Sequence, residues 1–159
     1  MIDRKIQLII SGFGWRILNG IRQFHKGVDN RSWNLKIWKR QPIIFPEKCE
    51  VLRLWRDKNG GGIAYKGLNS GLIFKSMHIK VNKDIKPKMV FEKKEIIGYS
   101  EKVKGMYEHE HWEILKKDTE GYDLEKYCKK NIYEFWIDPV DYYIERKIPY
   151  EYKNKQRKR

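Results

Sequence analysis

One run of residues constrains the fold of this chain more than any other: from Met77 to Lys83, apolar side chains alternate with basic or polar ones. Such a period of two predicts a half-buried strand. Its exposed face would carry His78, Lys80 and Asn82, and Pro87 would end it. A β-sheet therefore lies at the centre of the expected fold.

The rest of the expected sheet comes from residues 50–100. Residues 50–56 alternate imperfectly and predict another strand, and the run Asn59-Gly60-Gly61-Gly62 predicts the turn or loop after it. On either side the spacing predicts helices, a short irregular one over residues 4–24 and two in the stretch 101–152. The predicted fold class is α+β, a small twisted antiparallel sheet with an irregular N-terminal helical arm, C-terminal helices and a basic extended tail.

Composition divides the chain into four expected segments. They are an N-terminal arm (1–48), a basic β core (49–100), an acidic and aromatic helical segment (101–152) and a basic tail (153–159). Residues 1–100 hold 21 Lys and Arg against 8 Asp and Glu, residues 101–152 hold 9 against 13, and the tail adds five cations and no acid. Such segregation predicts a chain whose basic parts lie on a polyanion while its acidic part faces protein.

The overall composition favours nucleic acid as that polyanion. Of the 159 residues, 35% are charged and 40% hydrophobic, with a net charge of +14, so the chain has much surface for its core. Aromatic residues, at 14%, argue against disorder and can stack on bases, while Lys and Arg neutralise phosphates. An AT-rich genome also enriches Lys, but such a bias does not segregate charge.

Cysteine content and the beginning of the chain bear on its compartment. Cys49 and Cys128 give no disulfide framework and no zinc-site pattern, which favours reduced thiols, although a single bridge between them stays open. Near the start, no apolar stretch is long enough to span a membrane or to act as a secretory signal. Residues 1–27 carry five cations and one acid, a balance similar to that of an organellar presequence.

One cluster in the sequence has metal-binding residue types, namely Glu108-His109-Glu110-His111 with Glu113. Histidines at i and i+2 share a face of a strand but not of a helix, and the His-Glu-x-x-His spacing of zinc enzymes is absent. We therefore interpret the cluster as a solvated acidic turn. The chain also lacks a nucleophile elbow, a dinucleotide fingerprint and a Walker phosphate loop, so we expect no enzyme, no metal site and no cofactor.

Between Arg56 and Tyr99, several short motifs follow one another in order: Asn59-Gly60, Tyr65-Lys66-Gly67, Ser70-Gly71, a strand ending near Lys83, Pro87-Lys88-Met89 and Ile97-Gly98-Tyr99. In order and spacing this stretch resembles a mitochondrion-specific protein of the large ribosomal subunit, the family numbered forty-one in the unified scheme. The family's Gly-Arg-His-Thr segment is replaced by Leu72-Ile73-Phe74-Lys75, and its Gly-Gly-Tyr is missing.

The resemblance implies a structural constituent of the mitochondrial ribosome in the matrix, which binds ribosomal RNA and, through residues 101–152, other ribosomal proteins. It implies no catalysis and no small-molecule substrate. Basic side chains of the sheet and tail, with glycines that let the backbone approach, are the expected contacts with RNA. These residues are Arg53, Arg56, Lys58, Gly60, Gly61, Lys66, Gly67, Lys75, Lys80, Lys83, Lys86, Lys88, Lys153, Lys155, Arg157, Lys158 and Arg159.

Two other functions stay open on the sequence. One is an accessory subunit of an organellar membrane complex of the respiratory type, which would bury its aromatic residues and scatter its charge. The other is a nuclease, which would need acidic or histidine side chains beside a basic face, and His78 with Asp84 or Glu92 is the only such pairing. The arrangement of the basic residues in space distinguishes these hypotheses.

Overall fold

The computed structural model describes residues 1–3, 5–34, 39–116 and 135–152. These residues form mostly strands, with one helix, α2 (Pro139–Glu145), near the end. The strands are β1 (Gln7–Ser11), β2 (Gly14–Leu18), β3 (Ile21–His25), β4 (Gly27–Arg31), β5 (Trp33–Asn34), β6 (Lys39–Arg40), β7 (Pro42–Ile44), β8 (Cys49–Asp57), β9 (Gly60–Gly67), β10 (Ile73–Val81), β11 (Val90–Phe91), β12 (Ile96–Ser100), β13 (His109–Leu115), β14 (Trp136–Ile137) and β15 (Tyr150–Tyr152).

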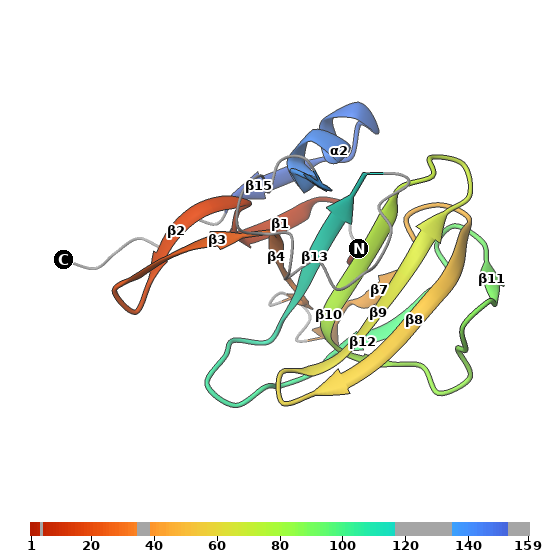
Figure 1. The fold of residues 1–159 in the computed structure, drawn as a ribbon, viewed down its shortest axis with the longest axis horizontal. Helices are drawn as coiled ribbons and strands as arrows, with labels where there is room; N and C mark the ends of the chain where they lie inside the picture. Colours follow the sequence, from red (N-terminus) through yellow and green to blue (C-terminus); the bar gives the residue numbers. More distant parts are fainter. Residues whose placement is uncertain (4, 35–38, 117–134, 153–159) are drawn as a thin grey trace.

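One large mixed sheet organises these strands (Figure 1). Its order is β11-β8-β9-β10-β13-β4-β1-β15, with β12 pairing with β10 and β7, and β14 pairing with β13. Strands β4 and β13, far apart in the sequence, are antiparallel neighbours in which Asp29 lies opposite His111. The pairs β2–β3 and β5–β6 form separate two-stranded ribbons, and the β2–β3 hairpin extends away from the large sheet (Figure 1).

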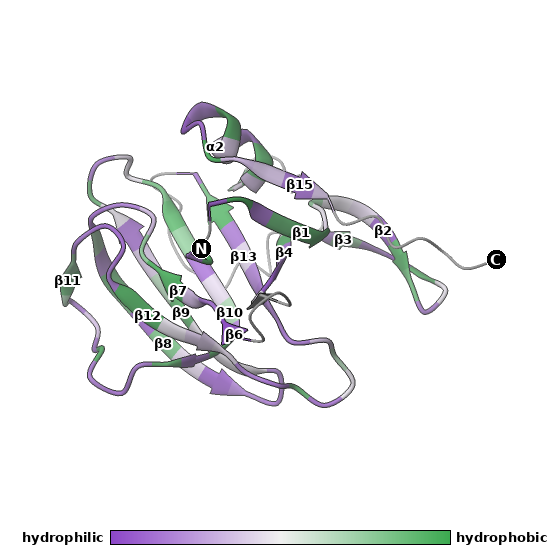
Figure 2. Cartoon of the chain, turned by 180° about the vertical axis from the view of Figure 1, so that it is seen from behind, coloured by the Kyte–Doolittle hydropathy of each residue, from purple (hydrophilic) through white to green (hydrophobic). Residues whose placement is uncertain are grey.

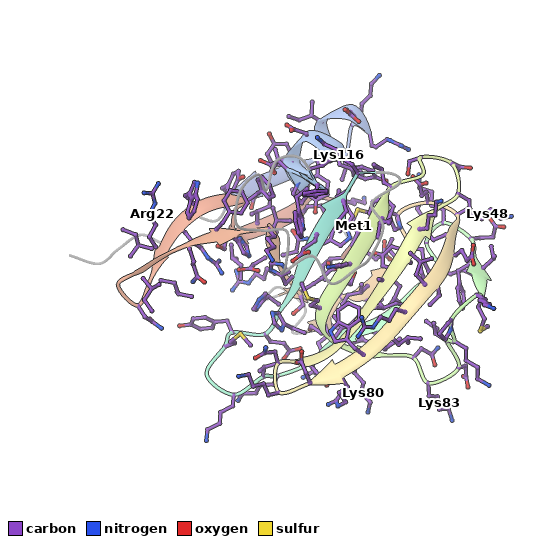
Figure 3. The ribbon with its side chains drawn as sticks, viewed as in Figure 1. Met1, Arg22, Lys48, Lys80, Lys83 and Lys116 are labelled. Carbon is purple, nitrogen blue, oxygen red and sulfur yellow. The ribbon has the colours of Figure 1, made fainter. Side chains whose placement is uncertain are left out.

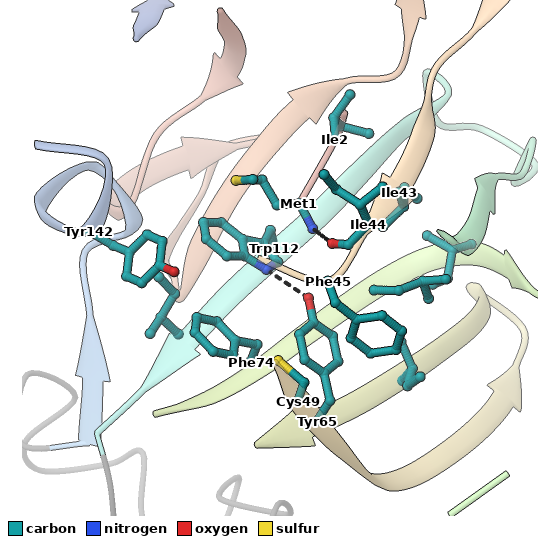
Figure 4. Packing of buried hydrophobic residues seen from close by; sticks show 14 of the residues in the cluster. Met1, Ile2, Ile43, Ile44, Phe45, Cys49, Tyr65, Phe74, Trp112 and Tyr142 are labelled. Atoms are coloured by element: carbon teal, nitrogen blue, oxygen red, sulfur yellow. Dashed lines mark hydrogen bonds between the residues drawn. The ribbon is translucent and has the colours of Figure 1, made fainter. Parts of the chain in front are cut away.

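The core lies on one face of this sheet and is rich in aromatic rings (Figure 4). Trp112 is fully buried on β13, and its ring stacks on Phe74 at a centroid distance of 5.8 Å and on Tyr143 of α2 at 5.5 Å. Burial of side chains of this size supplies most of the hydrophobic stabilisation of a small domain. Strands β10 and β13 are therefore held together by packing as well as by their ladder.

A chain of hydrogen bonds crosses this core beneath β13. The indole of Trp112 donates to the Tyr65 hydroxyl at 3.2 Å, and that hydroxyl lies 3.1 Å from the Ser76 hydroxyl. Ser76 donates to the Glu110 carboxylate at 2.8 Å, and the amino group of Met1 also contacts that carboxylate at 2.8 Å. A buried carboxylate is costly unless it is paired, so these contacts fix the orientation of β13.

The predicted α+β class is wrong, because the described residues of the segment expected to be the N-terminal helix form β1, β2 and most of β3 instead. Their apolar residues suit both spacings, but Gly14 and Gly20 have positive φ angles of 111° and 77°, which a helix does not tolerate. With Asn19 at φ 52°, Gly20 forms a two-residue turn of the I′ kind between β2 and β3.

The predicted helix in the first part of the acidic stretch is also wrong. Residues 109–115 form β13, which is buried along its whole length, so the charged residues there are not a solvated turn. Residues 117–134, including Cys128, and the basic tail over 153–159 lie outside the described residues. The division of the chain into four segments stays a prediction.

The two strands read from the sequence are confirmed, since β8 covers residues 50–56 and β10 covers most of the run beginning at Met77. Cys49 is a buried free thiol at the start of β8. Within the described part of the chain, no helix has the length and apolar character needed to cross a membrane.

Candidate metal centre

Strand β13 presents three polar side chains on the face opposite the core. Because side chains alternate along a strand, His109, His111 and Glu113 share one face while Trp112 packs into the core. Strand β4 lies beside them and places Asp29 opposite His111. Adding a Cβ at Gly27 would bring it to 2.2 Å from the carbonyl oxygen of Trp112, so the glycine permits this close approach of β4 to β13.

The fifth polar group comes from the hairpin. His25 is the last residue of β3 and lies four residues before Asp29. Its Nδ1 lies 2.6 Å from the carbonyl oxygen of Gly12, and its Nε2 lies 3.1 Å from Asp29 Oδ1. Arg16, on the paired strand β2, donates to the other oxygen of Asp29 at 3.3 Å and to the Ser11 hydroxyl at 2.7 Å. The base of the hairpin is thus part of the site.

His78 reaches the same site through an irregularity in β10. Strand β10 pairs with β13 up to Met77 and with β12 from Ile79, and its register with β9 shifts between these two residues. His78 is the residue in between, and its φ is +63°. In a regular strand it would point to the opposite side from Met77, but the bulge turns it toward β13. Its ring lies 4.9 Å from that of His109 and 6.0 Å from that of His111.

All four histidines of the chain therefore converge on one place, together with Asp29. His25 Nε2 lies 2.9 Å from His111 Nδ1, and His111 Nδ1 lies 2.9 Å from Asp29 Oδ1. The three ligand atoms of His25, Asp29 and His111 lie within 4.8 Å of one another. Ligand atoms as close together as these can all bind one metal ion.

The hydrogen bonds on the outer side of the two imidazoles show which nitrogens are left for a metal. A carbonyl only accepts, so the Nδ1 of His25 carries hydrogen and donates to Gly12; a carboxylate likewise accepts from His111 Nε2, which lies 3.1 Å from Glu113 Oε1. When both imidazoles are neutral, His25 Nε2, His111 Nδ1 and Asp29 Oδ1 direct lone pairs toward one point. A cation can occupy that point, either a metal ion or a proton on His111.

The charges of the site also favour a cation there. Burial alone would lower the pKa of His111, but its bonds to Asp29 and Glu113 raise that pKa to about 9. Burial would raise the pKa of Asp29, and its bonds to His111 and His25 instead hold that pKa well below the ordinary value. Burial likewise opposes ionisation of Glu113, whose pKa its bond to His111 lowers to about 2. The carboxylates are therefore negative, and the centre attracts positive charge.

Two imidazoles and one carboxylate are the ligand types that hold zinc in hydrolytic enzymes and iron(II) in oxygenases, each with positions left for other ligands. The two imidazoles are also held in orientation by hydrogen bonds from their other nitrogens, to the Gly12 carbonyl and to the Glu113 carboxylate, as metal-binding histidines generally are. The residues present thus fit a divalent metal ion bound by His25, Asp29 and His111.

His109 and His78 stand beside this ligand set. His109 donates from Nδ1 to the Tyr107 carbonyl at 2.5 Å, which leaves its Nε2 facing Asp29 Oδ1 at 3.5 Å. His78 donates from Nδ1 to the Asn59 carbonyl at 2.8 Å, which leaves its Nε2 as an acceptor. Burial, together with the neighbouring histidines, lowers the pKa of His78, so its imidazole is neutral and can accept a proton.

Replacing Glu113 by glutamine is expected to weaken zinc binding roughly 10- to 100-fold, because the carboxylate that orients His111 and raises its basicity is lost. A competition titration against a chromogenic chelator measures this affinity. Glu145→Gln, an exposed change at the end of α2, is the matched control and is expected to bind zinc as the unmodified chain does. Unchanged affinity in Glu113→Gln would show that His111 is oriented by other contacts.

Comparison with known proteins shows the fold but not the family. No protein-family model matches the sequence, and no curated protein sequence matches it either. Solved structures do match: LytU (TM-score 0.65, 18% identity, covering 86% of this chain and 84% of that one), the catalytic domain of the antimicrobial peptidase lysostaphin from Staphylococcus simulans (0.58, 16%, 83% and 88%) and a chain of the SpoIIQ–SpoIIIAH pore-forming complex (0.63, 15%, 88% and 85%). The mostly β architecture resembles the M23 peptidase fold.

These similarities overturn the ribosomal hypothesis. The identification as a mitochondrial large-subunit protein, its structural role on ribosomal RNA and its ribosomal partners are wrong, because the fold is shared with LytU and lysostaphin instead. The alternative of a respiratory-complex subunit is contradicted on the same ground. The expectation of a non-enzyme is contradicted by a peptidase among the structures with this fold, and the mitochondrial location by the bacterial source of that peptidase.

Of the residues expected to contact RNA, Lys80 and Lys83 lie toward one end of the sheet (Figure 3), and two others contact carboxylates of the protein. Arg56 pairs with Glu101 at 3.1 Å, and Lys75 lies 3.7 Å from Glu113 at the metal centre.

Among the glycines expected at RNA, Gly61 donates its amide to Glu101 at 2.7 Å, while a Cβ at Gly67 would lie 2.2 Å from Glu47 Oε1, so both serve internal packing. Gly60 has a positive φ of 96° in the β8–β9 hairpin. Contact of the individual residues with RNA stays a prediction, without the ribosomal assignment that suggested it.

The sequence pattern alone does not predict this centre. The pair His109 and His111 shares a face because residues 109–115 form a strand rather than the expected turn. His25 and Asp29 are four residues apart in a segment that no sequence motif marks. His78 does meet acidic and histidine side chains, but they are those of β4 and β13 rather than Asp84 or Glu92.

Proposed function

We propose that this protein is a zinc-dependent peptidase that acts on peptides of the bacterial cell wall. The observation that carries the proposal is the convergence of three metal-binding side chains and two further histidines at one centre, on a fold shared with an antimicrobial peptidase. A bound zinc ion would supply a Lewis acid that polarises a carbonyl and lowers the pKa of a water molecule.

The chain's own residues supply the proton transfers that peptide hydrolysis requires. His78 presents an unprotonated Nε2 at the centre and is suited to accept a proton from the attacking water. His109, fixed by the Tyr107 carbonyl, is suited to hold and deliver a proton to the departing amine. Their ring centroids lie 4.9 Å apart, so both can reach the same reacting group. This division of roles favours hydrolysis, and therefore zinc, over the oxygen chemistry of iron.

A component of a protein complex is the alternative function, since a chain of a pore-forming complex has the same fold. A purely structural role does not require four converging histidines that are each fixed by a hydrogen bond. The site therefore favours the enzyme.

Cell-wall peptides are the substrate class that the comparison with lysostaphin supports, because an antimicrobial peptidase has to cleave a peptide on which bacteria depend. The centre lies near solvent on one side, where His78 is half-buried and Tyr107, two residues before His109, is 80% exposed. A peptide substrate would approach from this side.

The test is digestion of purified peptidoglycan by the zinc-loaded protein, with unfolded casein in parallel and mass spectrometry of the released peptides. We expect soluble wall peptides with new amino termini, no release after treatment with a chelator, and recovery when zinc is returned. Cleavage of casein alone would contradict the cell-wall substrate, and cleavage of neither would contradict the peptidase.

A further inference from the structure

The β2–β3 hairpin carries hydrophobic side chains that nothing in the described part of the chain covers. Ile17 is 75% exposed, Ile21 68%, Trp15 58% and Leu18 48%. Three of them lie at the hairpin tip, defined here as residues 17–21, which extends away from the large sheet (Figures 1 and 2). Monomeric proteins seldom expose a cluster of large apolar side chains without a use for it.

The tip is a defined structure. Asn19 and Gly20 form the two-residue turn that closes the hairpin, and Leu18 pairs with Ile21 directly before it. Behind the tip the ribbon is held by Trp15 and Phe24, whose rings meet edge to face at 5.4 Å. The apolar side chains are therefore presented by a regular hairpin.

The apolar residues occupy both faces of the ribbon. Paired residues share a face, so Ile17 lies with Arg22 on one face while Leu18 and Ile21 lie on the other. A protein groove that received one face would leave the other exposed. A medium that surrounds the tip covers both faces at once, and the hydrocarbon edge of a lipid layer is such a medium.

The charges around the tip select the kind of lipid. Within the hairpin, residues 14–25, the only Lys or Arg are Arg16, bound to Asp29 at the base, and Arg22, and there is no Asp or Glu. Arg22, which pairs with Ile17 at the start of the tip, stacks over the Trp15 ring at 4.7 Å and points away from the protein (Figure 3). Tryptophan and arginine are favoured at the level of lipid headgroups, and basic residues there attract anionic lipids.

We propose that the tip of the β2–β3 hairpin inserts into the surface of a membrane that contains anionic phospholipid. Ile17, Leu18 and Ile21 enter the acyl boundary, and Trp15 and Arg22 lie among the headgroups. At about 3.4 Å per residue along β3, the ligand His25 then stands about 14 Å from Ile21. The metal centre is thus held just above the membrane surface, whatever its substrate.

The experiment is co-sedimentation of the full chain with vesicles of phosphatidylglycerol and phosphatidylcholine, and with vesicles of phosphatidylcholine alone. The tip variant is Ile17→Ser with Leu18→Ser and Ile21→Ser. Its matched control removes three exposed aliphatic side chains elsewhere: Val90→Ser, Ile96→Ser and Ile144→Ser.

We expect the unmodified chain and the control to bind the anionic vesicles, with weaker binding at high salt and to phosphatidylcholine alone. The tip variant is expected to lose about tenfold or more of its affinity, and Arg22→Gln roughly fivefold. If the triple tip variant does not fold, as judged by its thermal transition, Ile17→Ser alone provides the same comparison with a smaller effect.

Three outcomes would overturn the proposal. They are no binding by the unmodified chain, equal binding by the tip variant and the control, and a tip-dependent self-association without vesicles, which would make the hairpin a protein interface. Since peptidase activity is not measured, failure of this proposal is separate from failure of the proposed function.

Discussion

Replacing Asp29 by asparagine is expected to leave the protein without zinc. The carboxylate supplies the only formal negative charge among the three ligands, and its Oδ1 lies within 3.1 Å of both ligand nitrogens. An amide of the same size retains the packing but cannot balance the charge of the metal. Metal content after dialysis against a weak chelator is the measurement, with equimolar zinc expected in the unmodified chain and none in the variant.

Peptidase activity should fall to background in the same variant. His111→Ala is expected to have the same effect, with an added loss of stability because Asp29 and Glu113 lose their shared partner in a buried site. Asp57→Asn, on the exposed end of β8, is the control. Equimolar zinc in Asp29→Asn would show that the chain binds the metal elsewhere, and the proposed centre would be wrong.

Substitution of the other two histidines is expected to separate metal binding from catalysis. His78→Asn and His109→Gln should each retain equimolar zinc and lose roughly 10²- to 10⁴-fold in kcat, since both remove a proton-transfer group and neither removes a ligand. Asparagine is chosen at position 78 because it tolerates the positive φ of the bulge. Lys80→Ala, two residues along β10, is the control.

The double variant sharpens the test. If His78 and His109 work in a single proton relay, then losing both should cost little more than losing the more important one. Fully multiplicative losses would mean that the two act in independent steps. Loss of zinc from either single variant would place that histidine among the ligands and contradict the assignment made here.

The part of the fold that could be predicted is the part that local pattern controls. Strands β8 and β10 follow from alternation, because a half-buried strand has to place every second side chain in the core. The segment 4–24 could not be assigned in this way, since its apolar residues fit two periods. The information that decides it is in the glycines, whose left-handed backbone closes the hairpin.

The site could be predicted less well than the fold, because it depends on contacts between distant parts of the chain. That His109 and His111 share a face follows once β13 is a strand, but nothing local places β4 next to it. The bulge at His78 is a still finer feature, since alternation assigned that histidine to an exposed face. The signal in the sequence for the three candidate ligands is the spacing of His25 and Asp29, four residues apart, together with the histidine pair on β13.

Because all four histidines lie at one centre, the imidazole signals of this chain report on that centre alone. In an ordinary protein the imidazole resonances of a functional site must be distinguished from those of unrelated surface histidines. Here each of the four imidazole signals comes from the centre, two from side chains placed to bind the metal and two from those placed beside them. A nuclear magnetic resonance titration with zinc would therefore distinguish the two imidazoles that bind the metal from the two beside them. No mutants are needed to identify signals from unrelated histidines.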